Sequence, residues 1–280
     1  MNILKAINEA TKILKKNHIN TAKLDSEILL SKVIKRDRKY IILNSEKELK
    51  KDYFILFKEL IVKRSLGKPI AYLIGKKDFW KYEFCVSEDT LIPRPDTEIL
   101  IDYIIKNTKH KSKLKILDIG TGSGCILLSI LKEKEDFYGT GIDISKKCIE
   151  ISKINASKLN LSRRVKFFKS DVDNFFYGKY DLIISNPPYI KKLDLKYLDR
   201  DVIDFEPKLA LDGGLEGISE IRKVINRSSD LMKKNGKLVL EIGFDQKYKV
   251  KKLLKDKGFY INKVLKDYAN NDRCIVSTKI

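Results

Sequence analysis

The chain has 280 residues, with 58 lysines and arginines against 38 aspartates and glutamates, which gives a formal net charge of +20. Its apolar content of 43% is enough for packed cores and excludes wholesale disorder. The mean hydropathy is −0.29, and no apolar run approaches the ~20 residues of a membrane span. Charged residues interrupt the apolar ones near the N-terminus, so we expect no secretory signal there.

Cysteine and histidine usage argues against several kinds of site. The four cysteines, at positions 85, 125, 148 and 274, form no CxxC pair, so we expect neither a zinc site nor a disulfide framework. The two histidines stand among lysines and offer little for a metal centre or a nucleophilic triad. We therefore predict no metal site and a cytoplasmic protein.

The positive charge has two interpretations. An anionic partner such as nucleic acid is one of them. Lysine greatly outnumbers arginine, however, and is spread along the whole chain, a pattern typical of compositional drift. We favour the compositional interpretation, because none of the residues assigned to the chemistry below is a lysine.

Residues 1–75 are predicted to form a small helical bundle. Ile3, Ile7, Ala10 and Leu14 recur at helical spacing, and the segments 24–34 and 53–62 show the same periodicity. Residues 76–98 are aromatic and then rich in turn residues, which predicts a hairpin or linker. A helix is expected to start near Asp96 as its N-cap and to continue through the next turns.

From residue 113 onward, predicted strands alternate with predicted helices. The strands are expected at 113–120, 137–144, 164–172, 180–188, 237–243, 260–267 and 273–279, and residues 190–215 are expected to be irregular. Such alternation indicates an α/β fold with a mostly parallel sheet. Only residues 268–272 separate the last two strands, so one of them must run antiparallel. This arrangement is typical of a Rossmann-like methyltransferase sheet with an antiparallel C-terminal hairpin.

A glycine-rich loop follows the first of these strands. A dinucleotide fingerprint requires a third glycine at position 125, which is cysteine here. Asp118 places a carboxylate that would repel a pyrophosphate but suits a cationic ligand. S-adenosylmethionine carries an ammonium and a sulfonium and no phosphate. The loop residues that we predict to bind this cofactor are Gly120, Thr121, Gly122, Ser123 and Gly124.

Two further acidic residues stand at the ends of the next two strands. Asp143 ends the second strand, where an acid can accept both ribose hydroxyls. Asp171 ends the third strand, where it can accept from an adenine amino group, and Val172 can pack on the ring. Three acids at successive strand ends beside a glycine loop predict S-adenosylmethionine as the cofactor.

The fourth strand ends in Asn186-Pro187-Pro188-Tyr189. Two successive prolines give a rigid, extended backbone. We expect the Asn186 side-chain oxygen and the Pro187 carbonyl to accept one hydrogen each from a planar NH2 group, with Tyr189 packed on that group. Asn186, Pro187 and Tyr189 are thus the predicted catalytic residues, for a methyl transfer that depends on positioning and electrostatics.

Several segments together make the chain similar to the release factor glutamine N5-methyltransferase family, the HemK/PrmC group. They are GKPIAYLIGKKDFW (67–80), LIPRPDTE (91–98), DIGTGSG, NPPYI, EPKLALDGG (206–214) and LEIGFDQ (240–246). The resemblance covers nearly the whole chain, and IPRPDTE is its most specific element. The motifs show no serious departure from the family. The one difference is Val172, which stands where some relatives carry an aromatic residue.

This resemblance implies N5-methylation of the glutamine in the Gly-Gly-Gln motif of class 1 peptide chain release factors. It implies that Asn186 lines the cofactor site together with the loop residues and acids named above. It also implies that the residues from Asn186 to Tyr189 hold the glutamine amide, and that Arg94 and Glu98 shape the mouth of the pocket. It divides the chain into a helical substrate-recognition domain (1–75), a hairpin or linker (76–98) and a methyltransferase domain (99–280). It requires neither a membrane nor a nucleic acid as partner.

Three alternatives stay open at the level of sequence. Ribosomal-protein glutamine methyltransferases are similar but tend to carry a PRSP-type sequence in place of PRPD. A DNA or RNA amino-methyltransferase shares the fold and the NPPY sequence, and needs a nucleic-acid recognition element. A non-catalytic cofactor-binding or oxidoreductase domain is the third, against which NPPY and the missing dinucleotide glycine argue.

Overall fold

The computed structural model describes residues 1–280 and divides into two compact units. The first unit contains Met1–Lys76 together with Asp199–Phe205, and the second contains Lys77–Leu198 and Glu206–Ile280. The hairpin that the sequence separates as a linker thus belongs to the second unit from residue 77 onward. No helix is long and apolar enough to cross a membrane.

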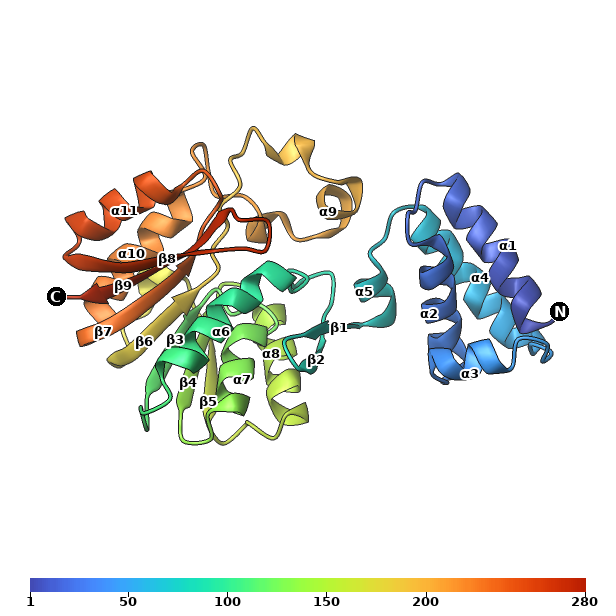
Figure 1. The fold of residues 1–280 in the computed structure, drawn as a ribbon, viewed down its shortest axis with the longest axis horizontal. Helices are drawn as coiled ribbons and strands as arrows, with labels where there is room; N and C mark the ends of the chain where they lie inside the picture. The colour runs from blue at the N-terminus through green and yellow to red at the C-terminus, as the bar shows by residue number, and fades with distance from the viewer. The chain divides into compact units, whose positions relative to one another are not determined.

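The first unit is helical (Figure 1). Asn2 caps its first helix, because its side chain accepts a hydrogen bond from the Lys5 backbone, a contact that stabilises a helix by about 1 kcal/mol. All four residues predicted to form the apolar face of this helix are buried, and so is Ala6. The helices are α1 (Ile3–Lys16), α2 (Ala22–Ile34), α3 (Arg38–Leu43), α4 (Lys51–Ser65), α5 (Ile70–Ile74) and α9 (Arg200–Phe205).

The second unit begins within a two-stranded hairpin, whose strands are β1 (Lys76–Phe79) and β2 (Tyr82–Cys85). The helix expected to start at Asp96 starts slightly later, because Pro95–Thr97 forms a 3-10 turn and α6 spans Glu98–Asn107. The prediction of Asp96 as the N-cap was therefore wrong. Proline is favoured in the first turn of a helix, where it needs no N–H partner, so Pro95 begins the turn.

The main sheet has seven strands in the order β5-β4-β3-β6-β7-β9-β8. The first five strands in that order are parallel, and β9 runs antiparallel to both of its neighbours. This confirms the predicted fold class, including the C-terminal hairpin. The strands are β3 (Lys115–Ile119), β4 (Tyr138–Asp143), β5 (Val165–Lys169), β6 (Tyr180–Ser185), β7 (Met232–Glu241), β8 (Phe259–Lys266) and β9 (Asp272–Lys279).

Helices cover both faces of this sheet, as Figure 1 shows. On one face α6 packs with α7 (Cys125–Glu133) and α8 (Lys146–Lys158) over one apolar core, and on the other face α10 (Ser219–Leu231) and α11 (Lys247–Asp256) cover a second core. The central strands β3 and β6 are mostly apolar and buried along most of their length, as a sheet covered on both faces requires.

The segment predicted to be irregular, 190–215, contains three short helical turns. These are a 3-10 turn at Leu195–Tyr197, helix α9 and a 3-10 turn at Lys208–Ala210. Ile190 forms a β-bridge with Asp212, so the far end of the segment lies beside its beginning, just after β6. The second half of this loop is thereby placed beside the ends of the parallel strands.

Candidate functional site

A cavity of about 490 Å³ opens where the parallel strands of the main sheet end. The carboxyl ends of parallel strands meet at one edge, which is where ligands bind in open α/β sheets. A space of this size suits a small-molecule cofactor. The predicted site residues that line it are Gly120, Gly122, Asp143, Asp171, Val172, Asn186, Pro187 and Pro188.

The glycine loop leaves open space on the cavity side. Gly120 and Gly122 have φ angles of 73° and 55°, and a Cβ atom built on either would meet nothing within 4 Å. Such backbone conformations favour glycine. Gly124 has a different role, because a Cβ there would lie 3.0 Å from Leu128 and 3.2 Å from Ser152. The first two glycines are therefore open to a ligand, while the third allows close packing beneath the loop.

Asp118, Thr121 and Ser123 do not line the cavity. Asp118 is 1% exposed, and its Oδ2 accepts a 2.7 Å hydrogen bond from the Thr121 hydroxyl. Burial raises the pKa of Asp118 to about 7, although the bond from Thr121 lowers it. These side chains support the loop from beneath it. In this geometry the Asp118 carboxylate does not face the cavity in which a cofactor would bind.

Asp143 lies at the cavity wall and anchors two backbone groups. Its Oδ2 accepts from Gly122 N at 2.9 Å, and its Oδ1 accepts from Ser145 N at 2.9 Å. Burial raises the pKa of Asp143, while these two N–H donors act to lower it. Each carboxylate oxygen has a further lone pair, so Asp143 can still accept hydroxyl donors from a ligand.

Asp171 and Val172 reach the cavity from the loop after β5. Asp171 lies two residues beyond the end of that strand and caps a short 3-10 turn, where its Oδ1 accepts from Asp173 N at 2.9 Å. Val172 is partly buried and packs on the second core. The pair thus presents one acceptor and one apolar surface to the same space.

The Asn186-Pro187-Pro188 segment forms another part of the wall, at the end of β6. Asn186 Nδ2 donates to the Thr97 hydroxyl oxygen at 3.3 Å. This bond uses the NH2 group of Asn186, and the side-chain oxygen takes no part in it. Neither proline has an N–H group, so the backbone at these two positions offers only carbonyl oxygens. The acceptor pair predicted for a planar NH2 group therefore belongs to residues that line the cavity.

Tyr189, predicted to pack on that group, does not line the cavity. Its hydroxyl donates to Glu241 Oε1 at 3.3 Å and accepts from Arg273 Nη1 at 3.4 Å. Burial and the adjacent Glu241 raise the pKa of Tyr189. The carbonyl of Tyr189 accepts from the Gln246 side chain at 2.8 Å. The tyrosine thus holds the segment from behind.

Arg94 and Glu98 also lie outside the set of lining residues. Arg94 forms an ion pair with Glu206, whose side chain is 2% exposed. Glu206 also accepts from Ile92 N at 3.2 Å, and it precedes Pro207, which lines the cavity. Glu98 accepts from Trp80 N at 2.8 Å and so holds the hairpin. Arg94 therefore acts on the loop wall through Glu206.

Sequence reasoning missed the residues behind this wall. Glu241 ends β7 and is 2% exposed, and burial raises its pKa to about 7, against the opposing effects of Thr97, Arg273 and Tyr189. The signal that pointed to Asp143, an acid at the end of a parallel strand, was present for Glu241 as well. Thr97 and Arg273 carried no such signal. No group of three or more His, Cys, Asp or Glu side chains is placed to hold a metal ion.

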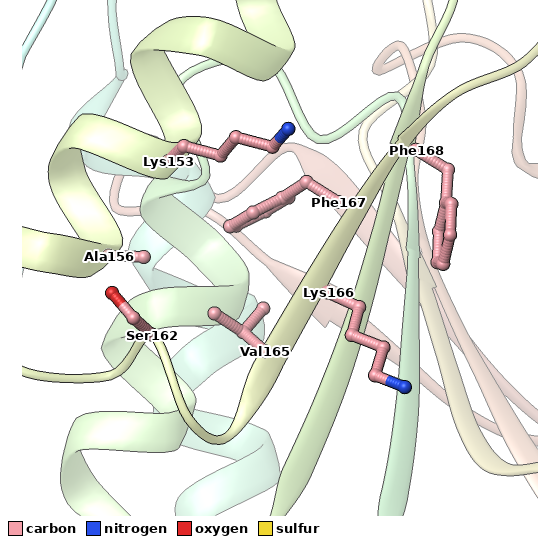
Figure 2. A pocket seen from close by; sticks show the side chains of 7 residues that line it. All are labelled: Lys153, Ala156, Ser162, Val165, Lys166, Phe167 and Phe168. Carbon is pink, nitrogen blue, oxygen red and sulfur yellow. The ribbon is translucent and has the colours of Figure 1, made fainter.

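A second hollow of about 340 Å³ lies along the edge strand β5 and helix α8 (Figure 2). Figure 2 shows Lys166 and Phe168 projecting to one side of the strand, and Val165 and Phe167 to the other, as strand alternation requires. It shares no residue with the cavity at the strand ends and contains none of the predicted site residues.

Comparisons with known proteins agree with this architecture. A family model described as PrmC N-terminal domain matches residues 5–75, and one described as methyltransferase small domain matches residues 95–215. The release factor glutamine methyltransferase of Buchnera aphidicola subsp. Acyrthosiphon pisum is 41% identical over 279 residues, which cover 100% of this chain and 99% of that protein. That of Clostridium acetobutylicum is 36% identical over 282 residues, with 100% and 99% covered.

Two solved structures share the fold. A methyltransferase from Pyrococcus furiosus matches with a TM-score of 0.53 and 17% identity, over 79% of this chain and 97% of that one. A ribosomal protein L11 methylase from Lactobacillus delbrueckii subsp. bulgaricus matches with a TM-score of 0.51 and 18% identity, over 73% and 89%. At such identities the likeness concerns the fold alone.

Proposed function

The chain belongs to the release factor glutamine methyltransferase family, and on that premise we propose that it N5-methylates a glutamine side chain of class 1 peptide chain release factors. The target is the glutamine of their Gly-Gly-Gln motif. The resemblance that the motifs indicated is thereby confirmed at the level of the family. The chain is a methyltransferase that uses S-adenosylmethionine.

The cavity residues fit that cofactor. Gly120 and Gly122 leave space that a Cβ would fill, and Asp143 and Asp171 supply acceptors suited to hydroxyl and amino groups. The acidic lining suits a ligand that carries positive charge and no phosphate. When bound, S-adenosylmethionine supplies a methyl group on a positively charged sulfur.

The chain's own contribution is to hold an amide nitrogen in line with that methyl group. The Asn186 side-chain oxygen and the Pro187 carbonyl accept one amide hydrogen each, which fixes the plane of the glutamine side chain. An amide nitrogen is a weak nucleophile. Most of the rate acceleration must therefore come from the fixed position of the amide and from hydrogen-bonding groups that are already oriented toward it. The wall that carries Pro207, Leu209 and Ala210 limits water at the same site.

One observation carries this proposal: the glycine loop and the Asn186-Pro187 acceptors line a single cavity. A cofactor on the loop and an amide at the acceptors then share one space, as direct transfer requires. The acceptor pair matches the two hydrogens of a primary amide.

We further propose that the first structural unit recognises the body of the release factor, that no nucleic acid is required, and that the protein acts in the cytoplasm. The proposal assigns recognition to a domain of residues 1–75 and catalysis to a domain of residues 99–280, with the hairpin of residues 76–98 between them. The two family models, which match separate parts of the chain, support it.

A methyl-transfer assay with tritiated S-adenosylmethionine tests the function. The acceptors are a release factor, the same factor with its Gly-Gly-Gln glutamine changed to alanine, ribosomal protein, DNA and RNA. We expect label on the first acceptor alone, and loss of about 100-fold or more in kcat for Asn186→Ala, with cofactor binding retained. Asn107→Ala, at the exposed end of α6, is the matched control with normal turnover.

Label on ribosomal protein or nucleic acid but not on the release factor would reject the proposed substrate. Normal turnover by Asn186→Ala would reject the proposed role of the acceptor pair. Mass spectrometry of the labelled peptide places the methyl group on the glutamine.

A further inference from the structure

Gln246 is the only glutamine in the chain, and it ends the LEIGFDQ segment, to which the proposed function gives no role. The residue is only 2% exposed. It follows β7 and is the N-cap residue of α11. A buried primary amide requires hydrogen-bond partners, because a buried polar group without them destabilises the fold. Its partners therefore indicate what this side chain holds together.

The Gln246 side chain joins two distant segments of the chain to the end of β7. Its Nε2 donates to the Tyr189 carbonyl at 2.8 Å, after β6, and to the Gly217 carbonyl at 2.9 Å, before α10. Its Oε1 accepts from Gly243 N at 2.9 Å. Both hydrogens of the NH2 group and the oxygen are thus used. Among side chains of this length, only the primary amide of glutamine supplies two donors and an acceptor in one plane.

Gly217 allows the chain before α10 to approach the Tyr189 carbonyl closely. Its φ is 71°, and a Cβ built on it would collide with the Tyr189 carbonyl oxygen and lie 2.7 Å from Gln246 Nε2. The adjacent loop bonds the same segment, because Gly213 N donates to the Ile190 carbonyl at 2.8 Å. The Tyr189 carbonyl is therefore enclosed by backbone on one side and held by the Gln246 amide, and glycine is the residue that fits at 217.

The backbone of the acceptor segment is anchored on both sides of its two prolines. Ser185 is the last residue of β6, and its Oγ donates to the Ile119 carbonyl at 2.7 Å. Tyr189 is the anchor on the other side. Pro187 and Pro188 donate no backbone hydrogen bond, and their rings fix their φ angles. A displacement of Tyr189 is therefore transmitted through a stiff backbone to the Pro187 carbonyl.

We propose that Gln246 is a positioning residue that holds the Tyr189 carbonyl and, through it, the acceptor pair. The Asn186 side-chain oxygen and the Pro187 carbonyl thereby stay where the substrate amide needs them. The inference rests on the proposed function, because it assumes an amide substrate at that pair. Gln246 does not line the cavity, whereas Asp143 and the glycine loop do. Its loss should therefore affect the transfer step and leave cofactor binding in place.

Gln246→Met tests this role, because methionine has a similar length but donates no hydrogen bond. We expect kcat with release factor to fall about 10- to 100-fold, while the affinity for S-adenosylmethionine changes less than about threefold. Gly217→Ala should give the same pattern, since the new Cβ displaces the same carbonyl. Because both changes act on one contact, the double variant should lose much less kcat than the product of the two single losses.

Two controls separate this role from a general loss of stability. Arg164→Met removes three side-chain bonds, to the carbonyls of Leu131, Lys134 and Phe137, at the end of the sheet where β5 begins, opposite the cavity. It should destabilise the fold but keep the parent kcat. Gly258→Ala imposes a similar backbone strain, with a φ of 76°, and its Cβ meets nothing within 4 Å, so it should also keep the parent kcat.

Calorimetric titration with S-adenosylmethionine shows which variants are folded. The inference is overturned if folded Gln246→Met loses no more kcat than Arg164→Met, if its cofactor affinity falls as far as its kcat, or if its loss multiplies fully with that of Gly217→Ala. If Gln246→Met does not fold, Gly217→Ala decides, and a kcat equal to that of Gly258→Ala overturns the inference. In each of these cases labelling of release factor by the parent still supports the proposed function. If the parent labels no release factor, both are overturned.

Discussion

The side-chain amide of Asn155 donates from its Nδ2 to the carbonyl oxygen of Ser123 at 2.8 Å, so helix α8 holds the glycine loop through a buried side chain. The same amide reaches the hairpin strand β2, where it donates to the Cys85 carbonyl at 3.0 Å and accepts from Cys85 N at 2.7 Å. One asparagine therefore satisfies three backbone groups from two segments that are distant in the sequence.

Asn155→Ala should lower the free energy of unfolding by about 3 kcal/mol, because it leaves buried backbone donors and acceptors without partners. It should also weaken cofactor binding, since the loop loses its support. Urea unfolding and calorimetry measure the two effects. Asn107→Ala, whose side chain bonds the Tyr103 carbonyl at an exposed position, is the control and should change neither by much. Equal effects in the two variants would contradict this role.

Gly120→Ala and Gly258→Ala separate backbone strain from loss of cavity space. The two glycines have φ angles of 73° and 76°, and a Cβ on either meets nothing within 4 Å. Each substitution should therefore cost about 1 kcal/mol of stability. Only Gly120 lines the cavity, so only Gly120→Ala should weaken S-adenosylmethionine binding, by about tenfold or more. Similar cofactor affinities in the two variants would argue against a cofactor on this loop.

Asp118→Asn should change how stability depends on pH. Burial raises the pKa of Asp118 in the folded protein to about 7, so the folded state binds its proton more tightly than the unfolded state does. This contribution to stability is complete below the unfolded pKa of about 4 and is lost as the pH rises through about 7. The free energies of unfolding at pH 5 and pH 8 should show that the variant becomes more stable relative to the parent as the pH rises. A constant difference would show that Asp118 does not titrate in this range.

Arg94→Ala should leave Glu206 buried without its ionic partner, because the Glu206 side chain is only 2% exposed. We expect a loss of about 3 kcal/mol, and a smaller loss when Glu206→Gln is added to the same chain. A double-mutant cycle from urea unfolding measures the coupling. Lys106→Ala, which removes an exposed pair with Asp102, is the control and should cost at most about 0.5 kcal/mol. Strictly additive losses at Arg94 and Glu206 would show that the pair is not coupled.

Local patterns were sufficient for the elements and for the outline of the site. Apolar periodicity located the helix with Ile3 and Leu14 on its buried face and the strands of the parallel sheet, because those patterns depend on neighbours in the sequence. The short link after residue 267 required an antiparallel last strand, and the structure has one. Asp143, Asp171 and Asn186 were expected at one edge since they follow parallel strands, and they line one cavity.

The sequence by itself therefore determined the fold class, the family and the edge of the sheet that carries the site. Only the tertiary structure decided which side chains face that cavity. It buried Asp118 against Thr121, paired Arg94 with Glu206, which lies 112 positions away, and placed Thr97 against Asn186, 89 positions away. It also turned Tyr189 toward Glu241 and away from the expected ligand position. Apart from the local Asp118–Thr121 bond, these contacts arise from the packing of distant segments, and no local periodicity records them.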